Sequence, residues 1–220
     1  MSVTVKTILF DAYGTLFDVY SVKEKCEQYF KGKGEAISRT WREKQLEYCF
    51  LSQILQAYKP FDDLTKKALV AALDIHQVHG SGEIMEDLMK AYEQLSPYEE
   101  TEEVLTKLKD KQTFIYSNGT QGMLDPLVRN SGLENLLGIL SADEVRQYKP
   151  SPSAYQYAMD KLGLHKTDIL FVSSNQWDIA GASSFGFKTA WVNRKEEPVS
   201  RMGFKPAIIV SDLRELLEEI

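Results

Sequence analysis

Polar side chains that could carry out chemistry follow several short apolar runs of the sequence. Asp11 comes directly after the first run, and Asp178 lies a few residues after a later one. A carboxylate placed like Asp11 can act as a nucleophile that forms a covalent ester, as a metal ligand, or only as a turn former. The polar residues that follow the runs are Asp11, Ser117, Asn118, Gly119, Lys149, Ser173, Ser174, Asn175 and Asp178.

Each of these residues also has an interpretation that requires no chemistry. Asp is common in turns, and a Lys before Pro150 is typical of an exposed, solvated turn. Ser117 or Asn118 could cap a following helix, and Asp178 could interact with the dipole of a helix in its first turn. What favours a functional site is that all of these groups would gather at one edge of a sheet.

The loop after Asp11 contains two residues that suit a catalytic role for this carboxylate. Gly14 fits a loop that needs a positive φ angle or a close approach of the backbone. Thr15 could donate a hydrogen bond to Asp11 and thereby fix its rotamer. Both residues therefore favour a catalytic role for Asp11 over a role as a turn former.

The apolar runs themselves predict a parallel sheet. They are rich in β-branched and aromatic residues, and segments of helical periodicity such as 102–109 and 153–162 separate them. Strands that alternate with helices form a parallel, Rossmann-like α/β sheet, and side chains just beyond the strand ends converge at one edge. The predicted strands are 3–10, 113–116, 169–172, 189–192 and 207–210, with a weaker candidate at 138–140.

Residues 18–94 break this alternation and read as several amphipathic helices. Breaks between the helices are expected at 32–34, 59–60 and 80–82, where Gly or Lys-Pro occurs. We therefore expect an α/β core domain formed by residues 1–17 and 95–220. An all-helical cap subdomain, residues 18–94, would be inserted after the first strand.

Composition excludes several classes of protein. The 220 residues are 43% hydrophobic and 26% charged with a net charge of −6, which is typical of a globular protein and not of a disordered one. No dense Lys/Arg block is present, so we expect no nucleic-acid or membrane partner. No apolar run is long enough for a membrane span or a secretory signal, which predicts a cytoplasmic protein.

Cysteine, histidine and glycine patterns support no further type of site. Cys26 and Cys49 have no metal-binding spacing and are expected to be two buried thiols, although a bridge between them is conceivable in an unusual compartment. His76, His79 and His165 support neither zinc nor Ser-His-Asp chemistry. A GxGxxG pattern is absent after the first strand, which argues against a dinucleotide site.

Four segments taken together resemble the haloacid dehalogenase superfamily, and specifically its L-2-haloacid dehalogenase branch. They are FDAYGTLF at 10–17, SNG at 117–119, YKP at 148–150 and FVSSNQWD at 171–178. In addition, WREKQLEY at 41–48 resembles the cap of that branch. The resemblance covers essentially the whole chain and implies the same fold, an α/β core with a helical cap.

The resemblance implies that Asp11 attacks C2 of a short L-2-haloalkanoic acid and displaces halide with inversion. Water would then hydrolyse the aspartyl ester and release the D-2-hydroxy acid. Taken alone, Arg42 could be a surface helix residue and Trp177 a core residue. The resemblance implies that Thr15 and Lys149 hold Asp11, and that Asp178 activates a water molecule that Asn175 or Ser173 orients. Ser117 and Asn118 would bind the substrate carboxylate, and the halide would be received by Arg42, Asn175, Phe61 and Trp177. The site would be lined by Ala12, Tyr13 and Tyr155.

Position 13 separates the branches of this superfamily. Its phosphatases resemble Asp-x-Asp-Gly-Thr and bind magnesium, whereas Tyr13 replaces the second Asp here, and 173–175 are Ser-Ser-Asn. A hard divalent cation needs several oxygen ligands, and Asp178 is the one bare acid left to accompany Asp11. We therefore expect no metal and no cofactor. The resemblance further implies a small 2-haloacid and water as substrates, and a homodimer formed through the cap. The alternatives are a magnesium-dependent phosphatase of small phosphate monoesters and a non-catalytic binding module.

Overall fold

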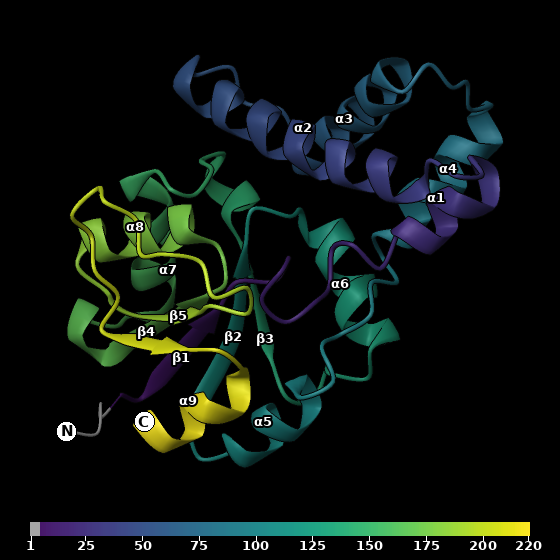
Figure 1. Ribbon diagram of the computed structural model, residues 1–220. Coiled ribbons are helices and arrows are strands. Elements are labelled where there is room, and N and C mark those ends of the chain that lie inside the picture. Colours follow the sequence, from purple (N-terminus) through teal and green to yellow (C-terminus); the bar gives the residue numbers. More distant parts are fainter. Residues whose placement is uncertain (1–4) are drawn as a thin grey trace.

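A parallel sheet forms the centre of the computed structural model, which describes residues 5–220 (Figure 1). Within these residues the sheet has six strands in the order β3-β2-β1-β4-β5-β6, so β1 lies between the two strands that flank the expected site. The predicted α/β class is confirmed. The strands are β1 Thr7–Phe10, β2 Gln112–Ser117, β3 Gly138–Ser141, β4 Ile169–Ser173, β5 Lys188–Val192 and β6 Ile208–Val210.

The predicted strands agree with the observed ones except at the ends. Residues 3 and 4 of the first prediction lie outside the described residues, and residues 5 and 6 precede β1. The weak candidate at 138–140 is a full strand that pairs with β2. All residues of β1 and β4 are buried, because a parallel sheet is covered on both of its faces.

Alternate residues of the strands pack into two separate hydrophobic clusters. Ile8 and Phe10 of β1 face one cluster, whereas Leu9 faces the other. The first cluster includes residues of α5 Thr101–Lys107, α6 Gln121–Asn130 and α9 Leu213–Glu219. The second includes residues of α7 Pro152–Leu162 and α8 Gln176–Phe185. Two short 3₁₀ helices, Ala142–Val145 and Lys166–Asp168, complete this part of the chain.

The segment between β1 and α5 is helical and lies beyond the sheet (Figure 1). We call its helices the cap helices: α1 Lys23–Tyr29, α2 Gly34–Ile54, α3 Phe61–Ile75 and α4 Gly82–Ala91. The predicted breaks at 32–34, 59–60 and 80–82 coincide with the starts of α2, α3 and α4. None of the helices in residues 5–220 has the length and apolar character needed to cross a membrane.

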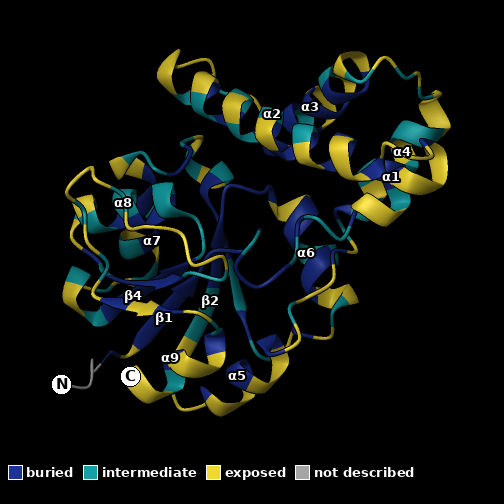
Figure 2. Cartoon of the chain, in the orientation of Figure 1, coloured by how far each residue is buried: buried dark blue, intermediate teal, exposed yellow. Residues whose placement is uncertain are grey.

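The cap helices bury one side each and leave the other exposed, whereas the central strands β1 and β4 are buried along their whole length (Figure 2). Trp41 and Cys49 of α2 are buried, and Leu69 and Ala72 of α3 are buried as well. Cys26 of α1 is also buried, and both cysteines are free, which confirms the prediction of two buried thiols. These buried residues of the cap helices belong to the same hydrophobic cluster as Ile8 and Phe10 of β1.

The chain passes between the sheet and the cap helices at two adjacent points. The backbone N–H of Asp18 donates to the carbonyl of Ser96 at 2.9 Å. Next to this bond, Phe17 forms an isolated antiparallel bridge with Pro97. The two segments that connect sheet and cap thus lie side by side.

Candidate active site

An ammonium group lies between two carboxylates at the carboxyl edge of the sheet. Nζ of Lys149 is 3.0 Å from Oδ1 of Asp11 and 2.6 Å from Oδ2 of Asp178. It also donates to the carbonyl of Tyr116 at 2.9 Å. Lys149 and Asp178 are 0% exposed and Asp11 is 4% exposed. The solvated-turn interpretation of Lys149 is therefore wrong, and the expected charge partner of Asp11 is confirmed.

The protonated form of Lys149 is favoured despite its burial. Burial alone would lower the pKa of Lys149, but the carboxylates of Asp11 and Asp178 outweigh it and raise the pKa. One positive charge thus serves two negative ones, and all three ammonium protons have acceptors. Lys149, which comes from the loop after β3, thus ties together the ends of β1 and β2 and the first turn of α8.

The second oxygen of Asp11 accepts hydrogen bonds from residues of two loops. Oδ2 of Asp11 lies 2.7 Å from Nδ2 of Asn175, 3.2 Å from Oγ1 of Thr15 and 3.3 Å from Oγ of Ser173. The Thr15 hydroxyl is itself fixed, because it accepts from the backbone N–H of Ser174 at 2.9 Å. These donors stabilise a carboxylate anion and hold it in one orientation.

Two glycines allow the loops to come this close together. Gly14 has φ of +88°, the positive value expected from the sequence. A Cβ at Gly119 would lie 2.9 Å from the hydroxyl oxygen of Tyr13, so a larger residue would push the loop after β2 away from the loop after β1.

Asp178 is an acid with a raised pKa. Burial raises its pKa to about 6, although the neighbouring charge of Lys149 acts in the opposite direction. Its Oδ1 accepts from the hydroxyl of Tyr155 at 2.6 Å. A carboxylate with this pKa is suited to accept a proton near neutral pH. Asp178 is in the first turn of α8, which the interpretation without chemistry also allowed, but its side chain is fully buried.

The side chain of Asn118 is engaged by the backbone of Lys149. Its Oδ1 accepts from the Lys149 N–H at 2.8 Å, and its Nδ2 donates to the Lys149 carbonyl at 3.1 Å. The Nδ2 also lies 3.5 Å from Sγ of Cys49 in α2. The Asn118 side chain is thus not free to bind a substrate carboxylate and instead positions Lys149. Ser117 accepts from the N–H of Gly119 at 3.1 Å and keeps its own hydroxyl proton to donate.

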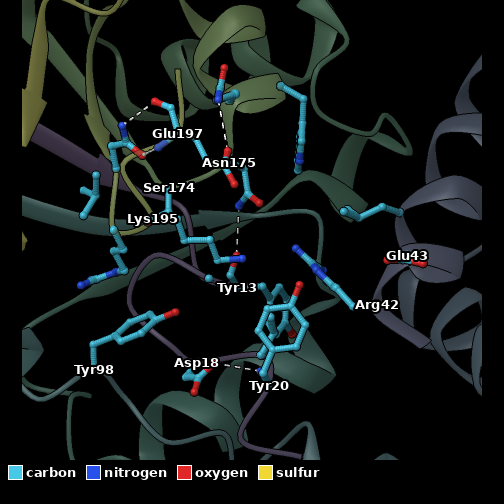
Figure 3. A pocket seen from close by; sticks show the side chains of 18 residues that line it. Tyr13, Asp18, Tyr20, Arg42, Glu43, Tyr98, Ser174, Asn175, Lys195 and Glu197 are labelled. Carbon is cyan, nitrogen blue, oxygen red and sulfur yellow. Dashed lines mark hydrogen bonds between the residues drawn. The ribbon is translucent and has the colours of Figure 1, made fainter. Parts of the chain in front are cut away.

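A cavity of about 570 Å³ lies between the cap helices and this edge of the sheet (Figure 3). Tyr13, Asn175 and Trp177 line it from the sheet side, and Arg42 and Leu46 line it from α2. Figure 3 shows Arg42 extending toward Tyr13, and its guanidinium carbon is 5.9 Å from the centre of that ring. The cavity therefore ends at the residues that hold Asp11.

Not every residue expected to line the site does so. Tyr155 is fully buried below Asp178, so it acts on this carboxylate and does not contact the cavity. The side chain of Ala12 is also buried, and its carbonyl accepts from the N–H groups of Leu16 and Phe17, which fixes the loop. Phe61 stacks on Tyr13 with ring centres 5.9 Å apart. Trp177 is half-buried, since it contacts Phe50 of the cap and also lines the cavity.

The residues at this edge do not fit a magnesium site. The ammonium of Lys149 lies between the two carboxylates and already compensates part of their negative charge. Nowhere in residues 5–220 do three or more His, Cys, Asp or Glu side chains form a group that could hold a metal ion. A hard divalent cation needs more oxygen ligands than remain here.

A sequence model of one protein family, the haloacid dehalogenase-like hydrolases, matches residues 5–186 of the chain. The chain belongs to this family. The residues of the buried Asp-Lys-Asp cluster all lie within the part of the chain that this family model matches.

Relatives within the haloacid dehalogenase-like hydrolases include named dehalogenases. An (S)-2-haloacid dehalogenase of Pseudomonas sp. (strain YL) is 40% identical over 217 residues, which cover 97% of this chain and 94% of that protein. Haloacetate dehalogenase H-2 of Moraxella sp. (strain B) is 36% identical over 209 residues, covering 94% and 93%. The structure of L-2-haloacid dehalogenase from Xanthobacter autotrophicus with chloropropionic acid covalently bound is 33% identical, has a TM-score of 0.91 and covers 98% of both chains.

Sequence reasoning did not identify every residue that contributes to this haloacid dehalogenase-like site. Gln45 and Thr65 are buried polar residues of the cap that form hydrogen bonds near Arg42. A signal for Gln45 was available, because it lies three residues after Arg42 and therefore on the same face of α2. The role of the Tyr116 carbonyl could not be predicted from residue type, because every residue has a backbone carbonyl.

Proposed function

We propose that this chain hydrolyses short L-2-haloalkanoic acids to D-2-hydroxy acids through an ester on Asp11. The observation that carries the proposal is the buried Asp11 carboxylate, which has the buried ammonium group of Lys149 as its cationic partner. The names of the relatives support the same reaction, including the one whose structure holds chloropropionic acid covalently. Tyr13 supports it further, because the phosphatase motif Asp-x-Asp-Gly-Thr has an Asp at this position.

The first step is a displacement at C2 of the substrate. A carboxylate oxygen of Asp11 forms a bond to C2 while the carbon–halogen bond breaks, and the halide leaves with the electron pair from the opposite side. Inversion of configuration follows from this geometry. A carboxylate is a weak nucleophile, so its fixed orientation and the exclusion of water contribute most of its reactivity. Arg42, Asn175, Phe61 and Trp177 receive the departing halide.

The second step is hydrolysis of the aspartyl ester. Water adds to the carboxyl carbon of Asp11 while Asp178 accepts one of its protons. The bond between this carbon and the ester oxygen then breaks, Asp178 returns the proton to the departing alkoxide, and the other proton of the water is released to solvent. The oxygen from water stays in the Asp11 carboxylate, and the product leaves with the oxygen that Asp11 supplied. Lys149 stabilises negative charge in both steps, while Ser117 and backbone N–H groups near Asn118 bind the substrate carboxylate.

We also propose that residues 18–94 form a cap over a core made of residues 1–17 and 95–220. The cap supplies Arg42 and Phe61, and the core supplies Asp11. Gln53 of α2 bonds to the N–H of Tyr148 at 2.7 Å and to Gln147 at 2.8 Å, which holds the cap against the loop that carries Lys149. Closure of the two parts would exclude water from the first step.

The decisive assay is halide release from L-2-chloropropionate in the presence of EDTA. We expect stoichiometric chloride and D-lactate, with no loss of rate on adding the chelator. Cleavage of p-nitrophenyl phosphate that depends on Mg²⁺, together with loss of all activity in EDTA, would instead establish the phosphatase. If neither substrate reacts, the binding module becomes the better interpretation.

The pH profile of turnover should depend on Asp178 and Tyr155. Because Asp178 must be ionised to accept a proton, activity should fall as the pH drops through about 6. The Tyr155 hydroxyl stabilises the ionised form, so Tyr155→Phe should raise the pKa of Asp178 and shift the acid limb to higher pH. Steady-state kcat measured from pH 4.5 to 9 tests this shift, and an acid limb that stays in place or moves down contradicts it.

We propose a homodimer that forms through the exposed end of α2. Ile54 and Leu55 are 75% and 70% exposed, and Leu51 beside them is 44% exposed. Apolar side chains clustered at one helix end can pack against the same end of a second copy about a twofold axis. Ile54→Glu combined with Leu55→Glu should therefore give a monomer by light scattering. Ile209→Glu, at an exposed apolar residue of β6, is the matched control and should leave the dimer intact.

We propose a cytoplasmic location on the basis of the cysteines. Cys26 and Cys49 are buried and free. Burial raises the pKa of Cys49 to about 12, so its thiol remains protonated and does not act as a nucleophile. Reduced, inert thiols fit a compartment that keeps cysteines reduced.

A further inference from the structure

Arg42 is a buried cation that no carboxylate neutralises. It is 6% exposed, and it forms no ion pair with an acidic residue anywhere in the described part of the chain. Instead, its Nη1 donates to Oε1 of Gln45 at 2.6 Å. The other guanidinium donors remain for the cavity that Arg42 lines. A neutral acceptor thus holds the guanidinium while leaving its positive charge uncompensated.

The orientation of the Gln45 amide follows from the hydrogen bonds behind it. Oγ1 of Thr65 donates to the carbonyl of Phe61 at 2.6 Å, and a carbonyl can only accept. With its single proton used, the Thr65 hydroxyl must accept from Nε2 of Gln45, which is 2.7 Å away. The Gln45 amide must therefore present its oxygen to Arg42.

The same residues also fix the aromatic part of the cap. Thr65 binds Phe61 through its hydroxyl and accepts from the indole of Trp41 through its carbonyl at 2.8 Å. Gln45, Thr65 and Trp41 are all 0% exposed, so water does not compete for these bonds. Arg42 and Phe61, the two cap groups next to Tyr13, are thus set by one buried network.

We propose that Gln45 and Thr65 are positioning residues that aim Arg42 at the leaving halide and preserve its full charge. This inference rests on the proposed function, in which Arg42 receives the halide. A carboxylate in place of the Gln45 amide would hold Arg42 equally well but would cancel the charge that attracts the anion. The amide is therefore required for its neutrality as well as for its shape.

Gln45→Glu tests the charge part of the proposal. The two side chains have the same size, and Glu can still accept from Arg42. Inhibition by added chloride and bromide should weaken about tenfold, the effect expected from losing one charge-assisted contact to the anion. The kcat for L-2-chloropropionate should fall by a similar factor, while KM changes less because the substrate carboxylate binds elsewhere.

Thr65→Val tests the orientation part. Valine keeps the shape of threonine but removes the hydroxyl, so the Gln45 amide loses its partner. Halide inhibition should weaken, and Thr65→Ser should restore it. Ser52→Ala is the matched control, because Ser52 is a buried hydroxyl of α2 that bonds to the carbonyl of Ala57, away from Arg42. Thermal unfolding of each variant shows whether weaker halide inhibition comes from a misplaced Arg42 or from a destabilised fold.

The outcomes separate this inference from the proposed function. Chloride binding is measured without substrate by ³⁵Cl NMR line broadening in the wild type, Arg42→Gln, Gln45→Glu and Thr65→Val. If Arg42→Gln weakens binding but Gln45→Glu and Thr65→Val match Ser52→Ala, the positioning role is wrong and the proposed function stands. If Arg42→Gln has no effect, the halide role of Arg42 is wrong and the positioning role fails with it. If the chloride results are as expected but L-2-chloropropionate is not hydrolysed, the proposed function fails while the positioning role survives.

Discussion

Asp11→Asn should reduce the turnover of L-2-chloropropionate by at least about 10⁴-fold, the size of effect seen when a covalent nucleophile is removed. An amide cannot form the ester, yet Asn has the shape of Asp and can keep several of the hydrogen bonds around Oδ2. Lys149 also retains Asp178 as its counter-charge, so the fold should persist. Chloride release measures the activity, and circular dichroism with thermal unfolding checks the fold. Asp62→Asn, at the exposed start of α3, is the control and should keep full activity.

The covalent role of Asp11 also has an isotopic consequence. In a single turnover in H₂¹⁸O with excess enzyme, the product hydroxy acid should carry no label, because its new oxygen comes from Asp11. The label should instead appear in the peptide that contains Asp11, as mass spectrometry can show. Labelled product in the first turnover would mean that water attacks C2 directly, which would contradict the ester mechanism.

Lys149→Met should cause the largest combined loss of activity and stability. Without the ammonium group, the buried carboxylates of Asp11 and Asp178 face each other unpaired. Breaking a buried ion pair in this way costs about 3 to 5 kcal/mol of unfolding free energy. Turnover should fall by about 10³-fold, since a fixed charge next to the reacting groups is lost. Urea unfolding and chloride release measure the two effects.

The pH dependence of this variant has a definite sign. With Lys149 absent, the pKa of Asp178 should rise further, because its attractive partner no longer opposes burial. An acid whose pKa is raised by folding stabilises the protein at low pH and loses that contribution as the pH rises toward the folded pKa. Lys149→Met should therefore be most destabilised relative to the wild type at neutral pH and less so near pH 4.5.

A second substitution separates the two losses. Lys149→Met with Asp178→Asn removes one of the two unpaired charges, so most of the lost stability should return. Activity should not return, because the double variant lacks both the cation and the base. If stability stays low in the double variant, the loss comes from altered packing and not from unpaired charge.

The strands were predictable because their residue types reveal burial directly. β1 and β4 are continuous apolar runs that end in polar residues, and this pattern is local to the sequence. The breaks between the cap helices were also predictable from local sequence, because Gly or Lys-Pro occurs where α2, α3 and α4 begin. The ends of strands were less certain: β1 begins at Thr7, although the backbone of Lys6 before it still bonds to Asp168 and Gln112.

The partners of individual side chains were harder to predict. Asn118 is expected at the site from its place after β2, yet its bond to the backbone of Lys149 joins residues 31 positions apart. Tyr155 is expected to line the site, but its hydroxyl bonds to Asp178 instead, a direction that depends on how α7 packs on α8. Such directions follow from tertiary packing, which residue spacing does not encode.

The adjacency of the two connections between sheet and cap has a consequence for how this chain can be rebuilt. Because the N–H of Asp18 bonds to the carbonyl of Ser96, the two ends of the helical insertion are held next to each other. For the rest of the chain, the insertion is therefore equivalent to a long loop whose ends already meet. A long loop with closed ends adds little to the entropy of folding the rest of the chain. A replacement for the helical segment would therefore need ends that meet beside Phe17 and Pro97, and it would also have to replace the bonds of Gln53 to Gln147 and Tyr148.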